Sequence, residues 1–154
     1  MLRFGLIVAA VVLVADQATK YWAATALMPY RPVPVMPSFN LTLSFNTGAA
    51  FSLLADGSGW QRWLFTALAL AVSVYLIWWL RALRPGERLV AAALGLVLGG
   101  ALGNVLDRMV HGYVIDFLDV YAGNWHWPAF NVADSAISVG VAMLVISVVL
   151  GRRV

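Results

Sequence analysis

Residues 89–106 read LVAAALGLVLGGALGNVL, a run that contains no charged side chain. A helix needs about 20 predominantly apolar residues to cross a bilayer. Three further stretches, at about 4–24, 63–80 and 129–150, are similarly long and mostly apolar. The sequence therefore predicts an all-α membrane protein, with four transmembrane helices in one polytopic domain over residues 1–154.

The composition supports this class. Of the 154 residues, 62% are apolar and 11% charged, and the mean hydropathy is +0.85. A soluble domain of this size buries only about 70% of the surface of its unfolded chain and could not hide so much apolar surface. The composition therefore argues against a soluble enzyme, a disordered chain and a nucleic-acid-binding module. With no cysteine and only two histidines, we expect neither a metal nor a cysteine nucleophile.

The first stretch has one alternative reading. Arg3 precedes an apolar run, as in a secretory signal peptide. No small-x-small cleavage site precedes Asp16, and apolar residues continue to Ala24. We therefore interpret this stretch as the first span.

The basic residues predict the orientation. One side of the membrane would hold Arg3, Arg81, Arg84, Arg88, Arg152 and Arg153, and the other Lys20, Arg31, Arg62 and Arg108. Lys and Arg mark the cytoplasmic side, so both termini are expected there. Lys20 and Arg108 lie beside Asp16 and Asp107 and are expected to pair with them. This pairing would neutralise two of the four cations on the outer side and so increase the excess of basic residues on the cytoplasmic side.

The link between the first two spans contains an extracytoplasmic β segment. Prolines at 29, 32, 34 and 37 exclude a helix there. Apolar residues then alternate with polar ones from Phe39 to Asn46, which is the period of a strand with one apolar face. We expect the β segment over about 39–54, lying at the membrane surface.

Polar residues inside spans are costly and need a reason. Asp16 and Lys20 are four residues apart and can pair on one helical face, which favours a structural ion pair over a chemical role. Gly95, Gly99 and Gly103 form a stripe that allows close helix packing. Next to this stripe, the outer end of the third span carries Gly100, Asn104, Asp107 and Arg108.

Two further acids are candidates for chemistry. Asp134 follows Asn131 at the outer end of the fourth span, with no basic residue within a turn, and Arg108 from another helix is its alternative, structural partner. Asp116 is bracketed by apolar neighbours, whereas Asp119 is interpreted as a solvated loop acid outside the site. Two carboxylates without metal ligands suggest an aspartyl pair that shares one proton and activates a water molecule.

Five segments in order resemble the lipoprotein signal peptidases, or signal peptidase II. They are Asp16 with Lys20, the segment FNTGAAFS at 45–52, GGALGNVLDR at 99–108, GYVIDF at 112–117 and PAFNVAD at 128–134. Each motif alone is weak, but their common order and spacing are specific, and the length and four spans also match.

The resemblance implies a function. The family cleaves bacterial prolipoproteins before a cysteine that carries diacylglycerol, at the outer leaflet of the cytoplasmic (inner) membrane and without a cofactor. Its catalytic aspartates correspond to Asp116 and Asp134. Its supporting residues correspond to Asp16, Lys20, Asn46, Gly48, Ala49, Gly100, Asn104, Asp107, Arg108, Asn131 and Ala133. The expected partners are the diacylated substrate and membrane lipid, and we expect a monomer with a small β-cradle.

Three other functions fit the sequence less well. A proton-coupled transporter would need polar residues through the inner half of the spans, but they gather at the outer ends. A scaffold packed through the glycine stripe would leave Asp116 and Asp134 without a purpose. A serine peptidase built on Ser58 has no suitable base nearby.

Overall fold

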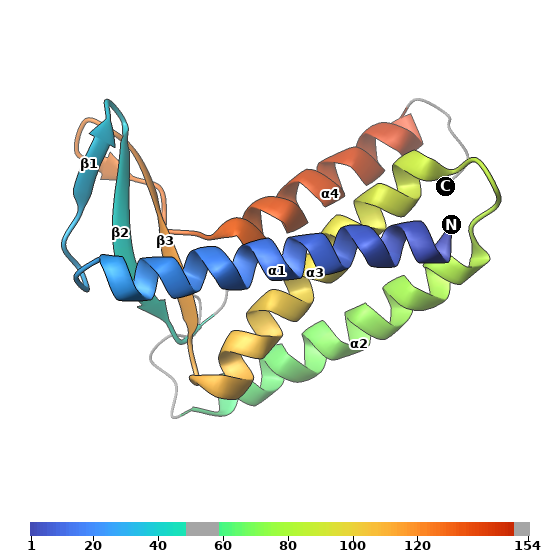
Figure 1. Ribbon diagram of the computed structural model, residues 1–154, viewed down its shortest axis with the longest axis horizontal. Helices are drawn as coiled ribbons and strands as arrows, with labels where there is room; N and C mark the ends of the chain where they lie inside the picture. Colours follow the sequence, from blue (N-terminus) through green and yellow to red (C-terminus); the bar gives the residue numbers. More distant parts are fainter. Residues whose placement is uncertain (49–58, 150–154) are drawn as a thin grey trace.

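A computed structural model describes residues 1–48 and 59–149. Ala49, the part of the predicted β segment at 49–54, Ser58, Arg152 and Arg153 lie outside these ranges. The helices are α1 (Leu2–Ala26), α2 (Trp60–Ala82), α3 (Arg88–Val110) and α4 (Val132–Val149), and all four are long and apolar enough to cross a membrane. The helices form a bundle with a sheet at one end, and the N-terminus and the end of α4 lie at the opposite end (Figure 1).

The predicted glycine stripe explains how α1 approaches α3. A Cβ on Gly95 would lie 2.5 Å from the carbonyl oxygen of Gly5, and one on Gly99 would lie 2.6 Å from that of Ala9. On the neighbouring stripe, Gly100 lies against the backbone of Ala133 in α4. Because both neighbours pack this closely, α3 is the most buried helix of the bundle.

The β structure is larger than the sequence predicted. Strands β1 (Val33–Met36), β2 (Phe39–Asn46), β3 (Val114–Ala122) and β4 (Trp125–His126) form an antiparallel sheet in that order. The first two come from the predicted link between α1 and α2, but β3 and β4 come from the link between α3 and α4. The sheet thus brings two distant segments of the chain together.

Two predicted details are wrong. The fourth helix begins at Val132, not near 129, because Phe130 forms backbone hydrogen bonds with β3. The buried residues of β2 do not alternate with exposed ones as predicted, because the register of its pairing with β3 shifts between Leu41 and Ser44. The buried side chains of β2 are therefore Asn40 and Leu43.

The turn after α3 directs the chain into β3. Gly112 has a φ of +85°, a left-handed conformation that glycine adopts without strain. Its N–H donates to the carbonyl of Arg108 and closes the end of the helix. Two residues later β3 begins, so this turn places Asp116 beside the helical bundle.

Candidate active site

Asp116 lies on β3, one of the two inner strands of the sheet, and is 2% exposed. Its cross-strand partner on β2 is Ser44. Asn46 Nδ2 donates to Asp116 Oδ2 at 3.3 Å, and Asn131 Nδ2 donates to Oδ1 at 2.8 Å. Amide groups therefore satisfy both carboxylate oxygens.

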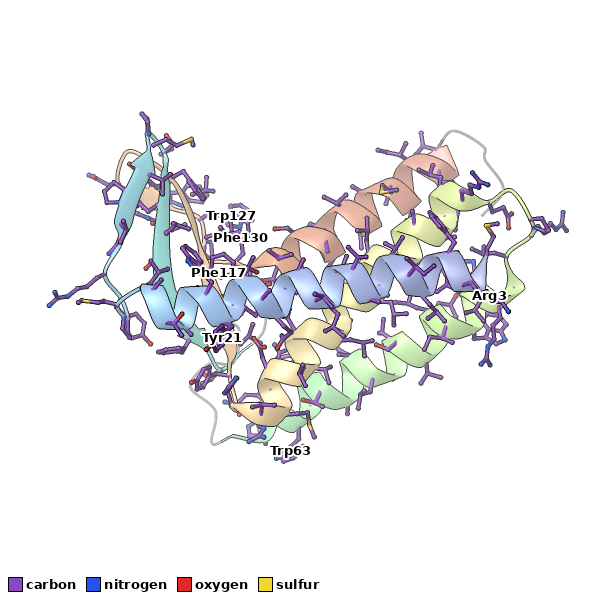
Figure 2. The ribbon with its side chains drawn as sticks, viewed as in Figure 1. Arg3, Tyr21, Trp63, Phe117, Trp127 and Phe130 are labelled. Atoms are coloured by element: carbon purple, nitrogen blue, oxygen red, sulfur yellow. The ribbon has the colours of Figure 1, made fainter. Side chains whose placement is uncertain are left out.

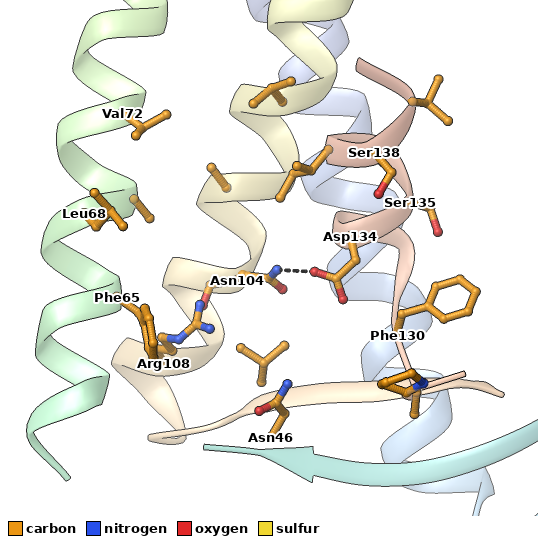
Figure 3. A pocket seen from close by; sticks show the side chains of 18 of the residues that line it. Asn46, Phe65, Leu68, Val72, Asn104, Arg108, Phe130, Asp134, Ser135 and Ser138 are labelled. Carbon is orange, nitrogen blue, oxygen red and sulfur yellow. Dashed lines mark hydrogen bonds between the residues drawn. The ribbon is translucent and has the colours of Figure 1, made fainter. Parts of the chain in front are cut away.

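Asp134 lies in the first turn of α4. Asn131 caps this helix, since its Oδ1 accepts the Asp134 N–H at 2.9 Å. Asn104 of α3 donates from Nδ2 to Asp134 Oδ1, also at 2.9 Å (Figure 3). Asn131 thus contacts both candidate aspartates and brings β3 and the start of α4 together.

A buried ionic cluster lies behind these two acids. Lys20 is 2% exposed, and its Nζ lies 2.7 Å from Asp16 Oδ2, 2.9 Å from Asp107 Oδ2 and 3.0 Å from Asn104 Oδ1. The three acceptors match the three donors of an ammonium group. The predicted pair of Asp16 and Lys20 is therefore present, and Asp107 joins it.

Each carboxylate of this cluster also holds a backbone group next to a candidate aspartate. Asp16 Oδ1 accepts the N–H of Ala133 at 2.9 Å. Asp107 Oδ2 accepts the N–H of Ile115 at 3.0 Å. The ionic cluster therefore fixes the residue immediately before Asp134 and the residue immediately before Asp116.

The partners of Arg108 differ from those expected. The sequence suggested Asp107, with Asp134 as an alternative, but no ion pair joins Arg108 to either acid, all three being described residues. Its guanidinium donates to the carbonyls of Gly48 at 3.0 Å and Asn104 at 3.3 Å. Asp107 pairs with Lys20 instead, and Arg108 binds the chain just after β2.

The remaining predicted residues support these contacts. Gly48 donates its N–H to Asn46 Oδ1 at 2.9 Å, which orients the Asn46 amide. Sequence reasoning missed Gln17, whose Nε2 donates to Asp107 Oδ1 at 2.9 Å and to Asp16 Oδ2 at 3.2 Å. The sequence indicated this role of Gln17 only through its position next to Asp16.

A cavity of about 720 Å³ lies between α2, α3, α4 and residues 127–130. Its lining is mostly apolar, with Leu68 and Val72 on α2 facing α4 (Figure 3). Polar groups gather at one end, near the sheet. The lining there includes Asn46, Asn104, Arg108 and Asp134.

The environment of Asp116 changes its acidity. Burial raises the pKa of Asp116 from 3.8 to about 7, and the negative charge of Asp134 contributes in the same direction. Hydrogen bonds from Asn46 and Asn131 and the charge of Lys20 oppose this shift. Such a group can gain or lose a proton near neutral pH, as acid–base catalysis requires.

The interpretation of Asp119 as a solvated acid is wrong. It is 5% exposed, and its carboxylate contacts Asn40 Nδ2 at 2.9 Å and His126 Nδ1 at 2.8 Å. It pairs with Asn40 across strands β2 and β3. Asp119 is therefore a structural acid of the sheet.

The fold and this site define a polytopic membrane protein with buried carboxylates and amides at one end of an apolar cavity. The model of the signal peptidase (SPase) II family matches residues 8–150. The chain belongs to this family of membrane proteases, which confirms the resemblance seen in the sequence.

Relatives cover nearly the whole chain. A lipoprotein signal peptidase of Polynucleobacter necessarius subsp. necessarius is 54% identical over 145 residues, covering 94% of this chain and 88% of that protein. One of Pseudomonas paraeruginosa is 51% identical over 157 residues, covering 98% and 93%. A solved bacterial membrane enzyme has a TM-score of 0.82 at 30% identity, covering 94% and 87%. The fold prediction, four membrane helices with a small sheet, is confirmed.

Proposed function

We propose that this chain is an aspartic endopeptidase that removes the signal peptide of diacylglyceryl-modified prolipoproteins, cleaving before the lipidated cysteine. The relatives that share about half of its sequence carry the name lipoprotein signal peptidase. The observation that carries the chemistry is the contact of Asn131 with both Asp116 and Asp134 at the polar end of an apolar cavity.

Asp116 and Asp134 act together in this proposal. Because the pKa of Asp116 is about 7, its carboxyl can hold a proton at neutral pH. We assign it as the acid that protonates the scissile carbonyl oxygen, while Asp134 takes a proton from the attacking water. The water oxygen bonds to the carbonyl carbon, and the C–N bond then breaks as the leaving amine receives the proton that Asp134 took from the water. The protonated carbonyl oxygen returns its proton to Asp116 as the carboxyl group of the product forms. The chain's own carboxylates suffice for these steps, and the proposal includes no cofactor.

The supporting residues position these carboxylates and the substrate. Lys20, Asp16 and Asp107 hold the backbone beside each acid, and Asn46 and Asn104 orient their oxygens. Arg108 lies at the polar end of the cavity, where its remaining donor capacity can face the peptide backbone or the lipid head. The apolar lining suits the lipid-embedded part of the substrate.

For the membrane arrangement, we infer that both termini are cytoplasmic and that the site lies at the outer leaflet of the bacterial inner membrane. Arg3, Arg81, Arg84 and Arg88 lie at the end of the bundle away from the sheet. At the sheet end, Lys20 and Arg108 are buried, which leaves Arg31 and Arg62 as the more accessible cations. Exposed Tyr21, Trp63 and Trp127 lie toward the sheet end, as in an interfacial aromatic belt (Figure 2).

This orientation has its own test. Reporter fusions after Gly86 should read cytoplasmic, and fusions at Gly123 should read external. An external signal at Gly86 would contradict the inferred orientation. We further expect the purified protein to act as a monomer of one domain, which light scattering in detergent would check.

The cleavage proposal is tested with purified protein and a prolipoprotein prepared with and without diacylglycerol. Release of the signal peptide is expected from the diacylated form only, because the lipid holds the scissile bond at the membrane edge. The Asp116→Asn variant is the matched inactive control. Equal cleavage of both forms would reject the lipoprotein substrate and leave a general membrane peptidase.

A further inference from the structure

Asp119 joins three strands of the sheet through its side chain. On β2, Asn40 Nδ2 donates to Asp119 Oδ2 at 2.9 Å. On β4, His126 Nδ1 lies 2.8 Å from Asp119 Oδ1, within reach for an imidazole N–H to donate to the carboxyl group. A buried carboxylate with one donor on each oxygen becomes costly when either donor is removed.

The strand that His126 belongs to is short. β4 contains two residues, and only Tyr121 and Ala122 of β3 pair with them. The His126 ring stacks on Tyr121, with ring centroids 5.1 Å apart. The contact with Asp119 therefore adds a side-chain anchor that joins β4 to a buried residue of the sheet.

The chain that follows β4 forms a wall of the proposed substrate cavity. We call residues 127–130 the wall segment, and all four line the cavity. Its backbone is anchored on both sides of Asp119: Trp127 N–H donates to the carbonyl of Val120 at 2.8 Å, and Phe130 N–H to that of Leu118 at 3.1 Å. Figure 2 shows Trp127 and Phe130 at the junction between the sheet and α4.

We infer that Asp119 and His126 are positioning residues that hold the wall segment in place and so set how tightly the cavity binds its substrate. Neither residue belongs to the catalytic pair or its supporting contacts. The inference rests on the proposed function, since it assigns the cavity to the substrate of that reaction. It predicts an effect on substrate binding that is separate from the chemical step.

The test uses two complementary substitutions at His126. His126→Phe keeps an aromatic ring against Tyr121 and removes the donor, whereas His126→Asn keeps a donor at similar reach and removes the ring. We expect KM to rise in His126→Phe, because the wall segment loses a side-chain anchor, with kcat little changed. His126→Asn should stay close to the parent protein. His111→Phe is the matched control, because His111 also stacks on a tyrosine, Tyr113, but lies at the end of α3.

Hydrogen exchange provides a readout that does not depend on cleavage. The amides of Trp127 and Phe130 should exchange faster in His126→Phe and not in His126→Asn or His111→Phe. The inference is overturned if exchange is unchanged in His126→Phe. It is also overturned if kcat falls together with the rise in KM and the melting temperature drops in both His126 variants, since that would indicate a general loss of structure. If the parent protein cleaves no diacylated substrate, the proposed function fails, and the exchange measurement still decides whether His126 holds the wall segment.

Discussion

Replacing Asp116 with Asn tests the origin of the raised pKa. Burial beside Asp134 raises the pKa of Asp116 from 3.8 to about 7, so the folded state binds this proton more strongly than the unfolded state does. The resulting contribution to stability is fully present below pH 3.8 and is lost as pH rises toward 7. Stability should therefore decrease through the acidic range and level off above neutrality.

The size of this effect follows from the shift. A change of about 3 pKa units corresponds to about 4 kcal/mol between the two ends of that range. Asparagine does not titrate. However, its NH₂ group takes the place of one Asp116 oxygen that accepts a hydrogen bond from Asn46 or Asn131, and the loss of that bond costs about 1–3 kcal/mol. Above pH 7 the Asp116→Asn variant should then be more stable than the parent by about 1–3 kcal/mol, and near pH 4 the order should reverse.

The assay is unfolding in detergent at a series of pH values, with cleavage of the diacylated substrate measured in parallel. Asp116→Asn should have no detectable turnover although it folds. Glu87→Gln is the matched control, because Glu87 lies between α2 and α3, at the opposite end of the bundle from the site. The reasoning is refuted if the parent and Asp116→Asn lose stability with the same slope between pH 4 and pH 7.

Other substitutions test the rest of the site and the helix packing. Asp134→Asn should abolish turnover, and the double variant with Asp116→Asn should be no worse than either single one in a cleavage assay, because groups that act as a unit are not additive. Lys20→Met should lower the free energy of unfolding by about 3–5 kcal/mol, since it leaves two buried carboxylates without their cation. Gly99→Val should lower the melting temperature of the protein, because its Cβ would lie 2.6 Å from the Ala9 carbonyl, whereas Ala10→Val on the exposed face of α1 should not.

The sequence was sufficient for the helices because span length and hydropathy are local properties. The glycine stripe was equally readable, since a period of four residues defines one face of a helix. Strand β3 was not predicted, because VIDFLDVYA has no clean alternation: four consecutive residues, Val114 to Phe117, are buried. Its partner β2 lies some 70 residues earlier, and sequence spacing does not indicate such a pairing.

Charge partners were the least predictable part of the site. Neighbours in sequence suggested Arg108 for Asp107, but Lys20 comes from α1, which the glycine stripe brings close to α3. Asp119 looked like a solvated acid because its burial depends on Asn40 and His126, which belong to other strands. Local sequence identifies an acid that needs a partner, but only the packing of distant elements decides which partner it has.

The ionic cluster around Lys20 is best explained by the backbone groups that its carboxylates hold in place. Burying an ammonium and two carboxylates costs several kcal/mol per ion, and apolar residues of similar volume would often stabilise a bundle as well. What apolar residues could not do is accept the N–H groups of Ala133 and Ile115, one residue before Asp134 and Asp116. One lysine orients both carboxylates that accept them. Lys20 on α1 thereby fixes the positions of two acids that come from separate elements, α4 and β3. A precisely spaced pair of reactive groups requires this kind of support.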